Sequence, residues 1–165
     1  KMGANIEVKN QRMESGEPCA DLEVKESVLK GIELSGDIIP NIIDEIPVIS
    51  IAAAFAEGET VIRDAAELRV KESDRLKAVS DGFNSLGVVH KNFDDGMCIS
   101  GSPDTLSINQ SATIESHDDH RIAMSFLIAG LKCSHPIIVK DCKNIFTSFP
   151  NFIELISSVG YKLEK

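Results

Sequence analysis

The sequence contains no tryptophan and a single tyrosine, and it is short of positive charge. Its 17 lysines and arginines are outnumbered by 26 acidic residues, which gives a formal net charge of −9. Because nucleic acids and anionic membranes attract positively charged surfaces, we expect neither a nucleic acid nor a membrane as a partner. An anionic small molecule would require a local cluster of cations that outweighs the overall charge.

Long hydrophobic runs and cysteine motifs are also missing. The longest nearly apolar runs, "VISIAAAFA" and "AMSFLIAGL", are about half as long as a membrane span. The amino-terminal "KMGANIEVKN" lacks the apolar core of a signal peptide. The four cysteines form no CxxC pair and no metal-ligand spacing; they are Cys19, Cys98, Cys133 and Cys142. We therefore expect buried, reduced thiols in a cytoplasmic protein, and no metal.

The composition that remains is typical of one globular domain, with 42% hydrophobic and 26% charged residues in a chain of 165. Gly3, Gly87 and Gly160 each follow an expected helix end and precede a short alternating segment, as left-handed helix caps do. They recur roughly every 80 residues, which indicates a repeated unit. Since Lys1 precedes Met2 and both ends fall at the same point of this unit, we expect a piece of a longer protein.

Helices and strands alternate along the chain, which predicts an α/β fold. Asp44 is a favourable N-cap for a buried helix whose first turn contains Pro47. Ser116 is expected to open a later helix, with Asp119 in the capping-box position. The expected helices are 44–57, 72–87, 116–131 and 148–160, and the expected strands are 60–64, 88–92, 97–100, 136–140 and 161–164.

The tetrapeptide VKES occurs twice, at 24–27 and at 70–73. The first copy lies in a strand-like context, where Lys25 and Glu26 are expected to be exposed and solvated. The second copy opens a helix, and three cations surround its Glu72, namely Arg69, Lys71 and Arg75. Because positive charge is unfavourable at a helix N-terminus, these cations indicate a role beyond helix formation.

Polar side chains occupy four expected helix starts, at Asp44, "RVKESDR", "SHDDHR" and "FTSFP". Free backbone N–H groups at helix starts bind anions, so a cleft lined by these ends could hold a phosphate or a carboxylate. The cations that would assist are Lys71, Arg75, His120 and Arg121. Two carboxylates, Asp44 and Glu72, could then serve as a proton donor and a proton acceptor, in either order.

Each of these residues also has a purely structural interpretation. Asp44 can serve only as a helix cap, and Asp118 and Asp119 as ordinary acids at a helix start. His117 and His120 could bind a metal, but no third ligand lies at a fitting spacing. The residues alone predict an anion-binding α/β domain with possible acid–base groups, and no more.

Three motifs resemble the C-terminal part of the 5-enolpyruvylshikimate-3-phosphate (EPSP) synthase family: "FAEGETVIRDAAELRVKESDRL", "DDHRIAM" and "TSFPNF". The resemblance covers essentially the whole chain. It implies an α/β (α+β) fold, an inside-out barrel of repeated βαβαββ units whose helices converge on the cleft between a pair of similar domains. We therefore expect one incomplete C-terminal domain, with units over about 1–40, 41–108 and 109–165.

The family's reaction is transfer of the enolpyruvyl group of phosphoenolpyruvate to the 5-hydroxyl of shikimate 3-phosphate, with release of phosphate. It belongs to the shikimate pathway of chorismate and aromatic amino acid biosynthesis. By motif, Asp44 corresponds to the carboxylate that contacts shikimate 3-phosphate and takes the proton, and Lys71 to the lysine beside the reacting hydroxyl. Glu72 corresponds to the acid that protonates the phosphoenolpyruvate methylene.

The resemblance also implies the groups that hold phosphoenolpyruvate, which correspond to Arg75, His120 and Arg121. It implies no cofactor and no metal. The partners are the two small-molecule substrates and the missing N-terminal domain of the same chain, without which we expect residues 1–165 to be inactive.

Two positions depart from the pattern of some family members. Thr147 stands where they have a lysine that contacts phosphoenolpyruvate, and Lys143 is nearby but out of register. Glu67 stands where they have an asparagine. The alternatives are a UDP-N-acetylglucosamine enolpyruvyl transferase, which shares the fold, and a non-catalytic anion-binding domain. The "RVKESDRL" and "DHRIAM" motifs favour the shikimate enzyme, and a pure anion binder gains little from Asp44 and Glu72.

Overall fold

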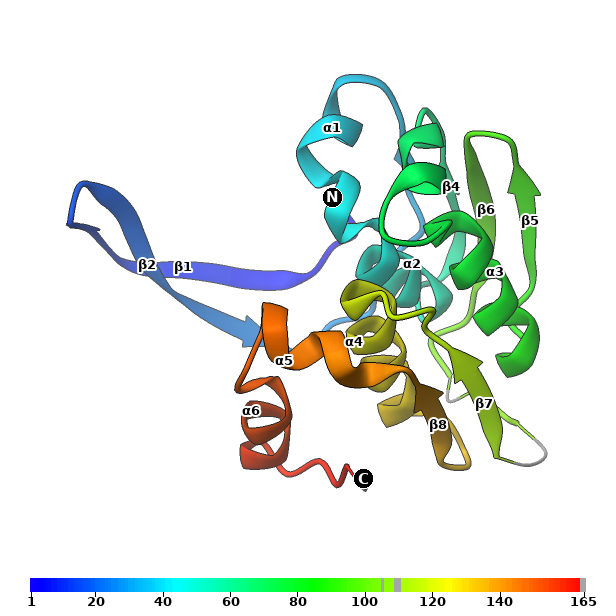
Figure 1. Ribbon diagram of the computed structural model, residues 1–165. Helices are drawn as coiled ribbons and strands as arrows, with labels where there is room; N and C mark the ends of the chain where they lie inside the picture. Colours follow the sequence, from blue (N-terminus) through cyan, green and yellow to red (C-terminus); the bar gives the residue numbers. More distant parts are fainter. Residues whose placement is uncertain (105, 109–110, 164–165) are drawn as a thin grey trace.

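The computed structural model describes residues 1–104, 106–108 and 111–163 (Figure 1). Its strands are β1 (Asn5–Glu14), β2 (Glu17–Lys25), β3 (Glu33–Leu34), β4 (Gly58–Ile62), β5 (His90–Phe93), β6 (Gly96–Gly101), β7 (Ala112–Glu115) and β8 (Ile137–Lys140). Its α-helices are α1 (Ile39–Ile42), α2 (Ile46–Ala54), α3 (Arg75–Leu86), α4 (His120–Ala129), α5 (Ile145–Ser148) and α6 (Phe152–Ser158). Short 3₁₀ turns occupy Gly36–Ile38, Ile43–Glu45, Ala66–Val70, Gly130–Lys132 and Cys142–Asn144.

The order of elements repeats along the chain. From β3 to β6 the main elements are strand, helix, strand, helix, strand, strand, and β7, α4, β8 and α6 repeat the first four positions. The first two strands of each copy pair in parallel, β3 with β4 and β7 with β8. This is the expected βαβαββ order. Strand β3 lies ahead of residue 41, the expected start of the second unit, yet it pairs with β4 of that unit.

Helices α2 and α4 form the interior, and the sheets lie outside them. Figure 1 shows α2 and α4 near the centre, with the four-stranded sheet β3-β4-β6-β5 on one side and the β7-β8 pair below. Helix α2 packs against α4 and β6, and α3 packs against β7. Gly82 of α3 lies directly against the Phe126 ring of α4, where an added Cβ would come within 2.1 Å of it. The two helices therefore approach closely only because this residue has no side chain.

Strands β1 and β2 form an antiparallel hairpin that projects from the body of the molecule (Figure 1). One face of the hairpin carries apolar cross-strand pairs, Ile6 with Val24 and Val8 with Leu22, and these four side chains are exposed. The opposite face carries charged residues, among them the ion pair of Lys9 with Glu23. The first VKES copy ends this hairpin, and its lysine and glutamate are exposed as expected.

Most expected elements are present, but several details were wrong. Asp44 lies in the 3₁₀ turn before α2 and does not cap it, because its carboxylate is bound elsewhere. Ser116 does not open α4; its hydroxyl donates to the carbonyl oxygens of Lys140 and Asp141, and Asp119 is the cap.

The carboxy-terminal elements also differ from expectation. The helix expected over 148–160 is present only as the shorter α6, which begins at Phe152; the separate short helix α5 precedes it and ends at Ser148, and residues 161–163 form no strand. Glu164, the end of that expected strand, lies outside the described residues.

The glycines and cysteines complete the comparison. Gly3, Gly87 and Gly160 all have positive φ, as left-handed caps require, and Gly87 caps α3. The four cysteines are free, as expected, but half-buried where full burial was expected.

In the described part of the chain, no helix combines the length and apolar character of a membrane span.

Candidate active site

Arg75, the first residue of α3, lies at the centre of a cluster of carboxylates. Its Nη1 donates to Asp44 Oδ1 at 2.9 Å, its Nη2 to Glu72 Oε2 at 2.6 Å, and its Nε to Asp119 Oδ2 at 2.8 Å. These carboxylates come from the start of α2, the loop before α3 and the start of α4. One guanidinium thus joins three helix starts. We call these four residues the Arg75 cluster.

The cluster has an enclosed half and an open half. The side chains of Arg75 and Asp119 are 1% and 0% exposed, whereas those of Asp44 and Glu72 are 46% and 52% exposed. A buried ion pair is favourable only when its remaining polar atoms are also satisfied. The exposed carboxylates are free to meet a ligand, while the buried pair fixes the guanidinium from behind.

Asp119 is satisfied on both oxygens because it also caps α4. Its Oδ1 accepts from the backbone N–H of Arg121 at 2.9 Å and from that of Ile122 at 3.4 Å. Its Oδ2 accepts from the Ser73 hydroxyl at 3.0 Å in addition to Arg75. An aspartate at an N-cap satisfies free N–H groups and is favoured by the helix dipole. The same carboxylate therefore starts one helix and holds the arginine of another.

The pKa values of the aspartates follow from this arrangement. Burial alone would raise the pKa of Asp119, but the hydrogen bond and positive charge of Arg75 hold it below its usual range. Burial likewise opposes the shift at Asp44, whose pKa is lowered by the hydrogen bond from Arg75 and by the charges of Lys71 and Arg121. Both carboxylates are therefore ionised at neutral pH.

Two further cations border Asp44. Lys71 Nζ donates to Glu67 Oε1 at 2.6 Å and lies 3.7 Å from Asp44 Oδ1. Arg121 Nη1 donates to the backbone oxygen of Asp44 at 2.9 Å and to Glu45 Oε1 at 2.7 Å. Both side chains are partly exposed, so a stronger anion could replace their carboxylate partners.

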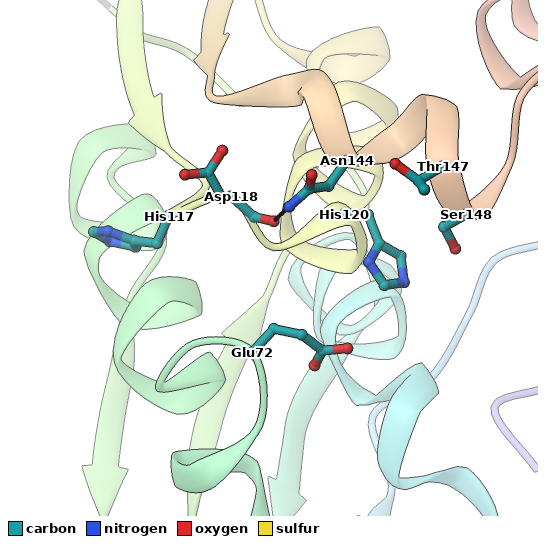
Figure 2. A pocket seen from close by; sticks show the side chains of 7 residues that line it. All are labelled: Glu72, His117, Asp118, His120, Asn144, Thr147 and Ser148. Atoms are coloured by element: carbon teal, nitrogen blue, oxygen red, sulfur yellow. Dashed lines mark hydrogen bonds between the residues drawn. The ribbon is translucent and has the colours of Figure 1, made fainter.

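Two hollows open beside the cluster. One, of about 400 Å³, is lined by Glu72, His117, Asp118, His120, Asn144, Thr147 and Ser148. Figure 2 shows the His120 ring and the Glu72 carboxylate on the same side of this hollow as Ser148, while His117 points away from them. The other, of about 410 Å³, runs from Asp44 and Arg121 along α4 to Phe149 and Phe152. His120 and Ser148 line both hollows, so the two adjoin.

A family model described as "EPSP synthase (3-phosphoshikimate 1-carboxyvinyltransferase)" matches residues 1–156. The chain belongs to the EPSP synthase family.

Relatives with this description cover nearly all of the chain. A 3-phosphoshikimate 1-carboxyvinyltransferase of Magnetococcus marinus is 48% identical over 163 residues, which are 99% of this chain and 36% of the relative. One from Legionella pneumophila (strain Paris) is 48% identical over 165 residues, 100% of this chain and 37% of the relative. The chain therefore spans little more than a third of the length of the curated relatives it matches.

Solved structures show the same fold. The structure of EPSP synthase from Acinetobacter baumannii superposes with a TM-score of 0.92 at 46% identity, over 99% of this chain and 38% of that one. The enolpyruvyl transferase NikO from Streptomyces tendae superposes with a TM-score of 0.66 at 17% identity. The match covers 96% of this chain and 33% of the NikO chain. The second likeness concerns the fold alone.

The structure brings together most residues that the EPSP synthase motifs singled out. The expected convergence of helix starts is confirmed for α2, α3 and α4 by the contacts of Arg75 with Asp44 and Glu72 and of Arg121 with Asp44. The fourth expected start, "FTSFP", was wrong, because this segment runs from the end of α5 into the loop before α6. Thr147 lines the first hollow, and Lys143 is absent from the lining of both. Arg69, one of the three cations around Glu72, donates to the backbone oxygens of Phe93 and Asp94 and therefore has a structural role.

One expectation about the EPSP synthase motifs needs revision, and another stays a prediction. Arg75 was expected to hold phosphoenolpyruvate; its guanidinium is enclosed by carboxylates and lines neither hollow. Asp119 was interpreted as an ordinary helix-start acid, yet it is fully buried and pairs with Arg75. Its sequence signals, the capping-box position and the "DDHRIAM" motif, gave no indication that it pairs with Arg75. His117 points away from His120 (Figure 2). Within the described ranges, no three His, Cys, Asp or Glu side chains gather in a metal-binding arrangement.

The lowered pKa of Asp119 predicts a loss of stability in acid. A carboxylate whose pKa is lower in the folded state stabilises the fold above its unfolded pKa, about 3.9, and this stabilisation is lost as the pH falls through the folded value. The free energy of unfolding of the 165-residue chain, measured with urea, should therefore decrease below about pH 4. The Asp119→Asn variant should be less stable at pH 7 and should lose less on acidification. Equal losses in both proteins would contradict this assignment.

Proposed function

We propose that this chain forms the carboxy-terminal part of a 3-phosphoshikimate 1-carboxyvinyltransferase. The reaction transfers the enolpyruvyl group of phosphoenolpyruvate to the 5-hydroxyl of shikimate 3-phosphate and releases phosphate. The remaining part of the active site would come from residues that the longer relatives carry outside the matched 36–38% of their length.

One observation carries the proposal. Asp44 and Glu72, the two carboxylates expected to move protons, bind the same guanidinium and remain about half exposed. Each also lines one of the two adjoining hollows. A protein that only bound an anion would gain nothing from two carboxylates at this place, because they repel a negative ligand.

The chemistry requires a base for the 5-hydroxyl of shikimate 3-phosphate and an acid for the methylene carbon of phosphoenolpyruvate. The 5-hydroxyl oxygen forms a bond to the central carbon of phosphoenolpyruvate while its proton goes to a base, and the methylene carbon takes a proton from an acid. Loss of a proton from the resulting methyl group then expels phosphate. Asp44 is the proposed base, with Lys71 beside it, and Glu72 is the proposed acid. Asp44 is ionised at neutral pH, as a base must be.

The anionic groups of phosphoenolpyruvate need cations or N–H donors that a ligand can reach. His120 and Arg121 meet this condition because both line the hollow that runs along α4. The Arg121 side chain is 30% exposed and now holds Glu45, which a phosphate or carboxylate of the substrate would replace. We assign these two residues to phosphoenolpyruvate, and Arg75 to holding the carboxylates rather than to a direct grip on the substrate.

A chimera tests the proposal. Residues 1–165 should replace the matching 37% of the Legionella pneumophila relative, to which they align over their whole length. We expect the chimera to release phosphate only when phosphoenolpyruvate and shikimate 3-phosphate are both present, and the isolated chain to release none. A chimera with native circular dichroism and cooperative melting that lacks this activity would overturn the proposed function. Turnover by the isolated chain would show that no other part of the cleft is needed.

A further inference from the structure

The two proposed proton-transfer groups share one support. Asp44 and Glu72 belong to segments that are separated along the chain, and each accepts a hydrogen bond from a different terminal nitrogen of Arg75. Because the guanidinium is planar and rigid, its two terminal nitrogens fix the distance and angle between the carboxylates they bind. The geometry of the acid–base pair therefore depends on where Arg75 is held.

Asp119 is what holds Arg75 in place. Its Oδ2 accepts from Arg75 Nε at 2.8 Å, and its Oδ1 lies 3.5 Å from Nη2. The Ser73 hydroxyl and the backbone N–H of Arg121 fix the carboxylate in turn. Asp119 is fully buried and lines neither hollow, so it has no route to a substrate.

We propose that Asp119 is a positioning residue for the transfer reaction: through Arg75 it sets the relative placement of Asp44 and Glu72. This inference rests on the proposed function, since it concerns the same acid–base pair. It also explains why a carboxylate is buried at this point, because a helix cap alone needs neither a charge nor full burial.

The charged groups around Arg75 also determine how the site responds to pH. Those in contact with it are Asp44, Glu72 and Asp119. Lys71 and Arg121 lie one contact further away, beside Asp44, and Glu67 lies beyond Lys71. Replacing Asp119 by Asn removes one of the three negative charges in contact with the guanidinium. The positive charge then acts more strongly on Asp44, and the acidic limb of the pH profile should move to lower pH.

The test uses Asp119→Asn in the chimera. Asparagine is as good an N-cap as aspartate, so its amide oxygen can keep the start of α4. Its amide nitrogen is a donor and cannot accept from Arg75 Nε as Oδ2 does, so the variant removes both the charge and the hydrogen bond that hold the guanidinium. We expect kcat to fall by up to about 100-fold, because misplaced catalytic groups have effects of this size. The KM values for both substrates should change by less than roughly threefold, since the substrate contacts remain. The acidic limb of kcat/KM should shift to lower pH.

Asp74→Asn is the matched control. Asp74 caps α3 and pairs with Arg69 at 3.0 Å, so it combines the same two roles at a neighbouring helix without contact to Asp44 or Glu72. Its substitution keeps the cap and removes only the partly exposed pair with Arg69, so it should lower the melting temperature slightly and leave kcat and the pH profile unchanged. An Asp119→Asn variant with an unchanged pH profile and kcat would overturn the inference, as would an equal effect from Asp74→Asn.

A second variant covers the case in which Asp119→Asn does not fold. Arg75→Lys keeps the buried charge beside Asp119, but one ammonium group cannot bind Asp44 and Glu72 in the fixed geometry of a guanidinium. It should lower kcat and also displace the acidic limb of the pH profile of kcat/KM. An unchanged pH profile would overturn the inference. If the unaltered chimera is inactive, the proposed function has failed; if it is active and the variants behave like it, only this inference has failed.

Discussion

Replacing Glu72 by Gln, or Asp44 by Asn, in the active chimera should lower kcat by about 10²–10⁴, the usual contribution of a general acid or base. Both substitutions preserve the size of the side chain and its ability to accept a hydrogen bond from Arg75. Both residues are about half exposed, so neither change leaves a buried charge without a partner. The loss should therefore appear in phosphate release in a single turnover, with little change in the melting temperature.

The repeated tetrapeptide supplies the control for this experiment. Glu26 occupies in the first VKES copy the position that Glu72 occupies in the second, but it is exposed at the end of the projecting hairpin. Glu26→Gln should leave kcat and both KM values unchanged. If Glu26→Gln and Glu72→Gln reduced kcat equally, the assignment of the acid to the second copy would be wrong.

Arg75→Met should destabilise the 165-residue chain by about 3–5 kcal/mol, because it leaves Asp119 buried with an uncompensated charge. Methionine fills much of the same volume, so the lost ion pairs rather than a cavity account for the effect. Urea unfolding at pH 7, followed by circular dichroism, measures the difference.

Two further variants identify the cause of this destabilisation. Arg12 also has two carboxylate partners, but it lies on the hairpin with 45% of its side chain exposed, so Arg12→Met should cost about 1 kcal/mol or less. The double variant Arg75→Met/Asp119→Asn should be more stable than Arg75→Met alone, because it carries no unpaired buried charge. A double variant that is less stable than the single one would contradict this explanation.

The local elements of the fold could be predicted from the sequence because their signals are local. Leu76, Val79, Phe83 and Leu86 lie at helical spacing, and they form the buried face of α3. The segments expected as strands over 88–92 and 97–100 correspond to β5 and β6, which pair antiparallel in the structure. The convergence of helix starts also followed from the repeat, since equivalent ends of repeated units lie on one face.

The partners within the site could not be predicted, because they are set by contacts between distant parts of the chain. Asp44 satisfies every local rule for an N-cap, but a guanidinium 31 residues later binds its carboxylate. Asp119 is 44 residues from Arg75, and nothing near it in sequence distinguishes a buried ion pair from an ordinary helix-start acid. The same limit applies to Arg75, whose charge suggested an exposed anion site although the fold encloses it.

The projecting β1–β2 hairpin has a consequence for how the stability of this chain is measured. A two-stranded ribbon is marginally stable by itself, and every residue of β1 is exposed, so the ribbon gains little from packing. Its amide hydrogens therefore exchange with solvent through local fraying, at rates unrelated to the unfolding of the core. Those of Thr60 and Ile99, buried on paired strands β4 and β6, exchange only through much larger openings. Probes on these inner strands report the global free energy, and probes on the ribbon report only its own opening.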